Sequence, residues 1–474
     1  MVFNNENRGF KFRILEDEDI YEIHLAALAI LENTGVVVNN AEALDMLSGA
    51  GCFIGKKNLV KMPSFLVEKA LRMAPKGITL SNRDGKPAMR LEGHNTYFGP
   101  VVDNPIFHDP FTGEYNNLVK KNLKQAALVA DNLKNIDFVS YGGNASDIPE
   151  EINSREIFKE VVQYIKKPIV FNSFLVRGTR EIIEIATEIA GGEEKLRQNP
   201  FIIHYSEPTS PLIHDDEPVK NILLCADKGV PLIYIPMPMG GATAPATLAG
   251  ILAQNTAEGL SGLVISQLRK EGSPFIFGGI PSIMDMSQTM IYPYGAPEMD
   301  LLTAGLTDIA HYYKLPVFGT VGCDSKSADQ QCAIEATSSC MMSILSGNNL
   351  VHDVGQIQGK ILSLETVVMV DEIVEMLRHT LKPIKINKET LALDIIDKVG
   401  PSGNFLSEEH TLKHFRNWWF PNLIDRTDYK QWVIDSKKQT FTEKLNNKAK
   451  EIIDNHEVES LPKDIIKYMN EYNK

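Results

Sequence analysis

Short apolar runs alternate with amphipathic segments through the central part of the chain. Each run has five or six residues and ends at a turn, which is typical of strands that are covered on both faces. The eight runs are 96–100, 136–141, 168–172, 201–205, 231–236, 274–278, 316–320 and 349–353. Apolar residues at helical spacing follow over 118–133, 151–166, 178–191, 216–228, 246–270, 297–313, 328–346 and 362–380. Eight strand–helix units favour a closed barrel over an open sheet, so we predict an α/β fold, a (β/α)8 TIM barrel.

Helical patterns also precede and follow the barrel. Apolar spacing predicts helices over 16–34, 40–50 and 63–73, and the chain after the barrel is helical again and holds all three tryptophans. We therefore predict N-terminal and C-terminal helical additions, the latter packing on the barrel. The predicted domains are an N-terminal helical layer at 1–90, the barrel at 91–382 and a C-terminal helical layer at 383–474.

The clearest strand–loop–helix unit runs from Val230 to Glu258. Its apolar run leads into Gly240 and Gly241, and helical spacing begins at Ala246. The glycine pair leaves the backbone open at the C-terminal end of the strand, where parallel α/β folds bind ligands. We expect Gly240 and Gly241 to let a ligand approach the backbone closely.

Composition narrows the class of protein. The chain is 43% hydrophobic and 23% charged, as in a globular protein with a sizeable core. Its formal net charge of −13 argues against a nucleic acid or an anionic membrane surface as partner. Five cysteines without an obvious pairing pattern favour a reducing compartment. No apolar run approaches 18 residues and the first residues lack a signal-peptide core, so we expect a cytoplasmic protein.

The residues that directly follow the strands should form the mouth of the barrel, where such enzymes carry their active sites. These residues are rich in glycine and aromatic side chains and poor in arginine. Aromatic faces with a few carboxylates suit an organic cation better than a phosphate, although any single aromatic is more often a core residue. The candidates for a cation-binding cage are Tyr97, Phe98, Tyr205, Phe277, Tyr292 and Tyr294, and Asp324, Glu207 and Glu298 are the candidates for its counter-charge.

Other chemistries have weaker signals. Cys332 and Cys340 are eight positions apart on one predicted helix, about 12 Å along its axis, which is too far to share a metal ion. His204 and His352 lie at different strand ends, where a single histidine is usually a hydrogen-bonded structural residue, so we predict no metal site. The chain has no GxGxxG, GxxxxGK[ST] or GxSxG motif. Lys326 follows Asp324 closely, and ion pairing is a more ordinary role for it than Schiff-base chemistry.

Four segments spread over residues 236–426 carry a family resemblance. They are MPMGGATAPATLAGILAQNTAEGLSG, GCDSKSADQQ, HDVG and EEHTLKHFRNWWFPNLIDR. Together they resemble the trimethylamine methyltransferase family. The resemblance implies a (β/α)8 enzyme that passes a methyl group from an amine to the cobalt of a separate corrinoid protein.

The absence of pyrrolysine indicates which branch of that family the sequence resembles. The founding members carry pyrrolysine at the barrel mouth, whereas every residue here is one of the twenty standard amino acids. The sequence therefore resembles the non-pyrrolysine branch, which demethylates quaternary amines such as glycine betaine, proline betaine, carnitine and γ-butyrobetaine. A quaternary ammonium already carries its charge, and its loss of a methyl group releases a neutral tertiary amine.

The resemblance also implies roles and partners. We expect catalytic roles for Asp324, Glu207 and His352, and contacts from His204, His352, Asn172 and Asn144 to the carboxylate of a betaine-type substrate. No corrinoid-binding DxHxxG motif occurs in the chain. We therefore expect no cofactor bound by this chain, with methylcobalamin/cob(I)alamin carried by a partner corrinoid protein, and we expect a homo-oligomer.

Two other functions stay open on the sequence. One is a zinc-dependent methyltransferase that passes methyl groups from methanol or a thiol to a corrinoid protein. The other is a non-catalytic barrel that only binds a betaine.

Overall fold

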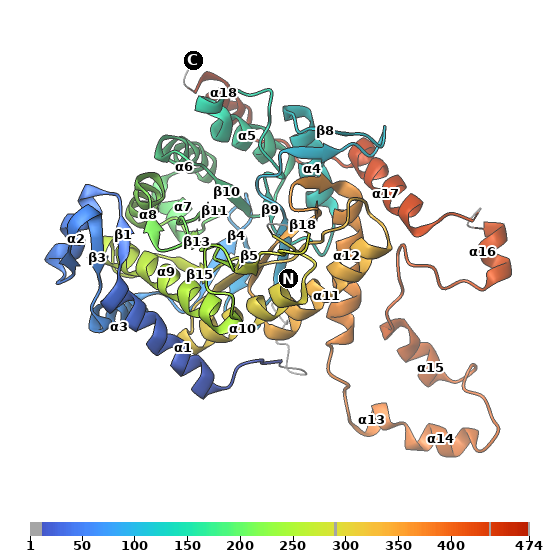
Figure 1. The fold of residues 1–474 in the computed structure, drawn as a ribbon. Coiled ribbons are helices and arrows are strands. Elements are labelled where there is room, and N and C mark those ends of the chain that lie inside the picture. The colour runs from blue at the N-terminus through green and yellow to red at the C-terminus, as the bar shows by residue number, and fades with distance from the viewer. Residues whose placement is uncertain (1–11, 289–291, 436–437, 473–474) are drawn as a thin grey trace.

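Eight parallel strands form a nearly closed barrel at the centre of the molecule (Figure 1). The structure is a computed structural model that describes residues 12–288, 292–435 and 438–472. The strands are β6 (Tyr97–Pro100), β9 (Val139–Ser140), β10 (Ile169–Asn172), β11 (Ile202–Ser206), β13 (Leu232–Tyr234), β15 (Phe275–Gly278), β17 (Val317–Thr320) and β18 (Leu350–Val354). β18 pairs with β6, and the Asp137 N–H donates to the Phe98 carbonyl at 2.6 Å, which brings β9 back to β6. The predicted barrel is confirmed.

A ring of helices surrounds the strands, one after each (Figure 1). They are α4 (Lys120–Asn132), α5 (Asn153–Val161), α6 (Val176–Ala190), α8 (Asp216–Lys228), α9 (Leu248–Arg269), α10 (Pro297–Tyr313), α11 (Gln330–Ser346) and α12 (Leu364–Thr380), with the short α7 (Glu193–Gln198) after α6. α9 is buried over most of its length, and a Cβ at its Gly262 would lie 2.3 Å from the ring of Tyr234. Glycine at this position therefore lets α9 pack directly on β13.

Small sheets extend the loops of the barrel. After β6 the chain forms β7 (Ile106–His108) and β8 (Tyr115–Asn117), which join β19 (Gln356–Ile357) and β20 (Ile361–Ser363) in one sheet. β14 (Met239–Gly240) pairs with β16 (Ser282–Ile283) beyond the ends of β13 and β15.

The N-terminal segment is a mixed layer of helices and strands. Its helices are α1 (Asp17–Ala29), the π-helical turn Ile30–Thr34, α2 (Ala41–Gly49) and α3 (Ser64–Met73), and α1 and α3 pack on α9. Its strands are β1 (Val36–Val38), β2 (Phe53–Ile54) and β3 (Leu59–Lys61), which join β12 (Ile213–His214). The predicted helical layer omitted these strands, because two or three residues are too few to show an alternating pattern.

A hairpin of β4 (Ile78–Ser81) and β5 (Pro87–Leu91) closes the N-terminal end of the barrel. Its apolar side chains Ile78, Leu80, Met89 and Leu91 belong to one buried cluster with inward-facing strand residues such as Ile203. The Ser81 N–H donates to the carbonyl of Pro200, just before β11. With this end filled, the C-terminal end is left for a ligand.

The C-terminal segment divides into two parts. α17 (Phe441–Asn455) packs on α4 and α12, and α18 (Lys463–Glu471) packs on α6. In contrast, α13 (Lys388–Leu391), α14 (Leu393–Val399), α15 (Glu409–His414) and α16 (Tyr429–Asp435) extend away from the barrel (Figure 1). Only part of the predicted C-terminal layer thus packs on the barrel, and the three-domain division stays a prediction. Within the described ranges, no helix is both long and apolar enough to cross a membrane.

Replacing Leu80 by alanine should destabilise the barrel by removing a fully buried side chain from the hairpin. We expect Leu80→Ala to lower the free energy of unfolding by about 2–5 kcal/mol, because the neighbouring strands cannot fill the space. Urea unfolding followed by circular dichroism measures this loss. The exposed neighbour provides the control, since Thr79→Ala should change the midpoint little. Equal effects of the two variants would contradict a packed hairpin.

Candidate active site at the C-terminal end of the barrel

A cavity of about 480 Å³ opens beside the C-terminal ends of β10, β11 and β13. It lies where TIM-barrel enzymes carry their active sites, and its size suits a small organic molecule. Four residues predicted for the site line it, namely Asn172, Tyr205, Glu207 and Tyr292.

Tyrosine side chains gather around this cavity. The Tyr292 hydroxyl donates to the carbonyl of Met237 at 2.5 Å, which fixes its ring over the end of β13. The rings of Tyr292 and Tyr294 are 6.4 Å apart, and Tyr205 is 5.8 Å from His352. Three of the six predicted cage aromatics therefore lie at the mouth.

The carboxyl groups of Glu207 and Asp215 line this cavity, and those of Asp103 and Asp353 are near enough to act on Tyr205. Burial and the nearby charge of Asp103 raise the pKa of Glu207 to about 7. Burial raises the pKa of Asp353 well above its ordinary value, and Asp103 adds to this although Thr320 donates to the Asp353 carboxylate at 2.6 Å. Asp103 is exposed to solvent on the loop after β6, and desolvation by the protein around it raises its pKa.

No basic side chain offsets these carboxyl groups. Among the described residues, no lysine, arginine or histidine lines the cavity, and none lowers the pKa of Glu207, Asp103 or Asp353. An acidic mouth faced by tyrosine rings is a suitable environment for a permanent organic cation, which supplies the missing positive charge and favours aromatic faces.

His352 is buried next to the mouth between Tyr205 and Phe318, with ring centroids 5.8 and 4.4 Å away. Burial lowers its pKa to about 3, so the imidazole is neutral. Its Nδ1 lies 3.0 Å from the Asp353 carboxylate, and its Nε2 has no hydrogen-bond partner in the described parts of the chain. A neutral ring can donate or accept one hydrogen bond to a ligand but contributes no charge.

Asp324 holds the loop that carries Tyr294. Its two carboxylate oxygens accept the N–H groups of Tyr294 and Gly295, each at 2.9 Å. The helix cap that follows is Asp329, which accepts the Cys332 N–H, and Lys326 donates to the Asp324 carbonyl rather than to its carboxylate. The charge of Asp324 thus acts on backbone groups beside the mouth.

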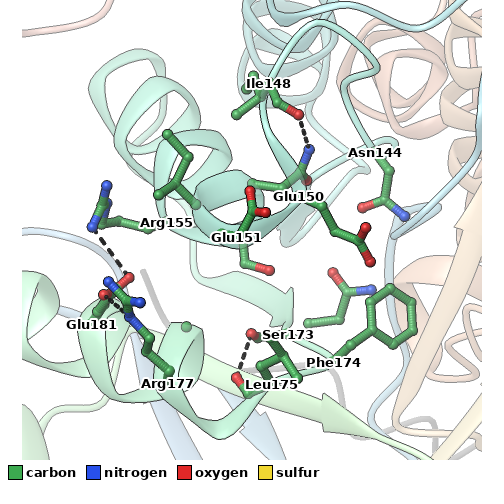
Figure 2. Close-up of a pocket in the computed structure, with 15 residues that line it drawn as sticks. Asn144, Ile148, Glu150, Glu151, Arg155, Ser173, Phe174, Leu175, Arg177 and Glu181 are labelled. Atoms are coloured by element: carbon green, nitrogen blue, oxygen red, sulfur yellow. Dashed lines mark hydrogen bonds and ion pairs between the residues drawn. The ribbon is translucent and has the colours of Figure 1, made fainter.

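A second cavity of about 260 Å³ adjoins the first and shares Asn172, Ser173 and Phe174 with it. Figure 2 shows Asn144, Glu150 and Phe174 on one side of this cavity and Arg155, Arg177 and Glu181 on the other. Glu181 pairs with Arg177 at 2.9 Å and with Arg155 at 3.4 Å. Asn144 and Asn172, both predicted to bind the substrate, therefore line the same smaller cavity, and Asn172 also lines the larger one.

Four predicted site residues lie away from the mouth. Phe98, His204 and Phe277 are on the strand faces that contact the outer helices: His204 bonds Thr179 of α6 at 2.9 Å, and Phe277 packs on Tyr313 of α10. Tyr97 faces inward, but at the start of β6, where its hydroxyl accepts the Arg90 N–H of the hairpin. These positions place them outside the site.

Three other predicted residues line neither of the two cavities. Glu298 is half-buried in the first turn of α10. Gly240 and Gly241 belong to the loop after β13, and a Cβ at Gly241, where φ is +87°, would lie 2.7 Å from the Met286 side chain. The close approach at Gly241 is thus to a neighbouring loop.

Sequence reasoning missed Asp103 and Asp353. Asp353 directly follows His352 in the HDVG segment, and its left-handed backbone (φ +69°) turns it back toward Thr320. Asp103 sits in the loop after β6 without a recognisable motif. Across the described residues, no three His, Cys, Asp or Glu side chains are grouped to hold a metal ion, and the absence of a metal stays a prediction.

Comparison with known proteins assigns the family. The chain matches the trimethylamine methyltransferase (MTTB) family over residues 3–474. It belongs to this family. A trimethylamine methyltransferase of Desulfitobacterium hafniense is 32% identical over 464 residues, covering 96% of this chain and 92% of that protein. A glycine betaine methyltransferase of the same species is 29% identical over 429 residues, covering 89% of each.

Solved structures support the fold. The monomethylamine methyltransferase of Methanosarcina barkeri aligns with a TM-score of 0.50 and 14% identity, covering 94% of this chain and 95% of that one. The hydroxylamine complex of the MtmB protein aligns equally well, with 15% identity. At these identities the likeness shows a shared fold.

Asp324→Asn should loosen the loop at Tyr294, because an amide can accept one of the two backbone N–H groups but presents a donor to the other. We expect faster amide hydrogen exchange in a peptide spanning residues 292–296 and a lower rate of substrate turnover, with little change in melting temperature. Mass spectrometry measures the exchange. Asp285→Asn is the matched control, since the half-buried Asp285 accepts the Ser287 N–H within its own turn and, among the described residues, makes no contact that holds residues 292–296. Unchanged exchange at 292–296 would contradict the positioning role.

Proposed function

We propose that this chain demethylates a quaternary amine and transfers the methyl group to Co(I) of a partner corrinoid protein. The observation that carries the proposal is the acidic, tyrosine-lined mouth, with Glu207, Asp103 and Asp353 offset by no basic side chain in the described chain. Membership of the MTTB family and its glycine betaine methyltransferase relative support the same chemistry.

The ammonium group of the substrate is proposed to lie in the larger cavity. Tyr205 and Tyr292 line that cavity, and each well-placed ring stabilises a cation by about 0.5–2 kcal/mol. Glu207 supplies a counter-charge in a site largely shielded from water, where the attraction is stronger than in bulk solvent. Asp324 acts as a positioning residue for the loop of Tyr294, and His352 offers Nε2 as a neutral hydrogen-bonding group.

The bond changes need no proton transfer by the protein. A corrinoid in the Co(I) state supplies the nucleophile that accepts the methyl group. The carbon–nitrogen bond breaks, its electron pair stays on nitrogen, and a neutral tertiary amine leaves. The chain's own task is to orient the methyl group toward the opening and to keep water from the reacting centre.

The corrinoid is proposed to arrive on its partner protein. A cavity of about 480 Å³ accommodates a small amine, and a corrinoid macrocycle is far larger. The partner therefore has to present its cofactor across the open mouth. The absence of pyrrolysine from the sequence supports the branch that acts on quaternary amines.

A betaine-type substrate also has a negative end, for which the two cavities offer a place. We assign its carboxylate to the amide groups of Asn172 and Asn144, which both line the smaller cavity. The arginines of the smaller cavity are already paired with Glu181, so amide donors are the more suitable partners. His204, which contacts α6, takes no part.

The expected cytoplasmic location and the homo-oligomer also belong to this proposal. The charge of the mouth favours a cation over methanol or a thiol, which weakens the zinc-dependent alternative. The third alternative, a barrel that binds a betaine without reacting, is separated from the proposal by the assay below.

The proposal predicts methyl transfer from quaternary amines to free cob(I)alamin. With a panel of quaternary amines, including glycine betaine, carnitine and choline, the purified chain should form methylcob(III)alamin with at least one compound. The tertiary amine that corresponds to each reactive quaternary amine should react at least tenfold more slowly, because a tertiary amine lacks the permanent positive charge. The cobalt absorption spectrum reports the product. Tight binding without transfer would instead support the non-catalytic barrel, and activity that needs stoichiometric zinc would support the zinc enzyme.

Cation binding should strengthen with pH, because Glu207 ionises near pH 7. For tetramethylammonium, whose charge does not titrate, we expect up to tenfold tighter binding at pH 8 than at pH 6, measured by calorimetry. Folding raises the pKa of Glu207 from about 4.5 to about 7, so the folded state favours the protonated carboxyl group. The stability of the unliganded protein therefore falls as the pH rises from about 4.5 through 7.

Glu207→Gln should bind the cation weakly at both pH values and remove most of this pH dependence. Glu114→Gln is the control, because Glu114 is exposed and lies on the distant β7–β8 turn. A pH dependence that survives in Glu207→Gln would assign the titration to another group.

A further inference from the structure

Residues 383–421, here called the arm, leave the body of the molecule after α12 and return 38 residues later. The return point is fixed because the N–H groups of Asn422, Leu423 and Ile424 all donate to the Glu372 carboxylate of α12. Between these points α13, α14 and α15 project away from the barrel (Figure 1).

The arm is apolar but has no core of its own. Every residue in 383–421 is described, and among them only Ala392 is buried. Its exposed large hydrophobic side chains are Ile384, Ile386, Leu391, Leu393, Ile396, Phe405, Leu406, Leu412, Trp418 and Phe420. Leu406 and Ile384 are each 88% exposed. Ten exposed large apolar side chains within 39 residues are more than a free surface usually carries, which indicates an interaction site.

The helices of the arm cannot be stable without a partner surface. α13, α14 and α15 have 4, 7 and 6 residues, whereas isolated helices in water are marginal below about 12–15 residues. The ion pairs that connect them, Lys398 with Glu408 and Lys413 with Glu389, join exposed groups and contribute little. The apolar side chains must therefore pack on another surface.

A complementary surface lies beside the base of the arm. An apolar groove of about 430 Å³ is lined by Met341 and Leu345 of α11, by Leu377 and Leu381 at the end of α12, and by the first two residues of the arm, Pro383 and Ile384. On the same helix α11, Ile334 is 71% exposed. One chain thus carries both an unpartnered apolar arm and, at its base, an apolar groove that the rest of the arm does not cover.

We propose that the arms of two copies of this chain are exchanged, each packing on the groove side of the other copy. An arm and a groove on one chain satisfy two-fold symmetry, since the contact that one copy makes is returned by its partner. The exposed parts of the ten side chains provide on the order of 1,000 Å² per arm, so two arms exceed the roughly 1,600 Å² of a standard interface.

Charge favours a second copy as the occupant. The arm has five lysine or arginine and five aspartate or glutamate residues, whereas the whole chain has a formal net charge of −13. A neutral arm can approach another acidic copy without the repulsion that the two bodies exert on each other. A corrinoid protein has to bind and leave in each cycle, whereas large apolar contacts are typical of permanent assemblies.

Molar mass in solution tests the exchange. The full chain has a mass of 52.8 kDa, so light scattering after size exclusion at micromolar concentration should give an even multiple of this value. The triple variant Leu393→Asp, Leu406→Asp, Leu412→Asp should halve the number of copies. Amides of the arm should also exchange with solvent at least tenfold faster in this variant than in the wild type.

The matched control is Phe53→Asp with Phe65→Asp. These two side chains are each 62% exposed, comparable to the arm residues, but lie on the N-terminal layer, so the mass should not change. The proposal would be overturned if the wild type were a monomer or if the triple variant kept the wild-type mass. It would also be overturned if the chain were a monomer whose arm binds only the corrinoid protein. These outcomes do not depend on whether the chain transfers methyl groups.

Discussion

A closed parallel barrel can turn only every second side chain of each strand inward, and this alternation determines what its mouth contains. Asn172, Tyr205 and His352 lie on inward positions near the C-terminal ends of their strands. Phe98, His204 and Phe277 are one position away from inward sites and pack on the surrounding helices instead. The chemistry of the site is therefore selected by the register of the strands.

This constraint also separates what sequence could predict from what it could not. The number of strands follows from eight apolar runs of nearly uniform length, and strand ends follow from the turns after them. The sequence does not show which residues of a buried strand point into the barrel, because residues on both faces are apolar and no alternation of apolar and polar positions remains. Of the six aromatic residues predicted for the cage, Phe98 and Phe277 therefore lie on the outer side of the barrel wall and Tyr97 lies at its other end.

The paths of the loops are a second feature that the sequence could not predict. Tyr292 and Tyr294 reach the mouth through a loop whose path depends on the Asp324 carboxylate and on the Tyr292–Met237 hydrogen bond. Asp103 and Asp353 depend on contacts between segments that are distant in sequence, so no local pattern identifies them. Together with Glu207 they give the mouth carboxyl groups whose raised pKa values disfavour ionisation unless a positive charge lies nearby.

The hairpin that fills the N-terminal end of the barrel has a consequence for the synthesis of the chain. Ile78 and Leu80 leave the ribosome early, whereas Leu350, a member of the same buried cluster, is among the last barrel residues to be made. The hairpin cannot bury its apolar face until the remaining strands exist, and contacts between such distant segments form slowly. During translation the nascent chain therefore exposes an aggregation-prone apolar surface until the last strands are made. Such exposed surface is what chaperones bind.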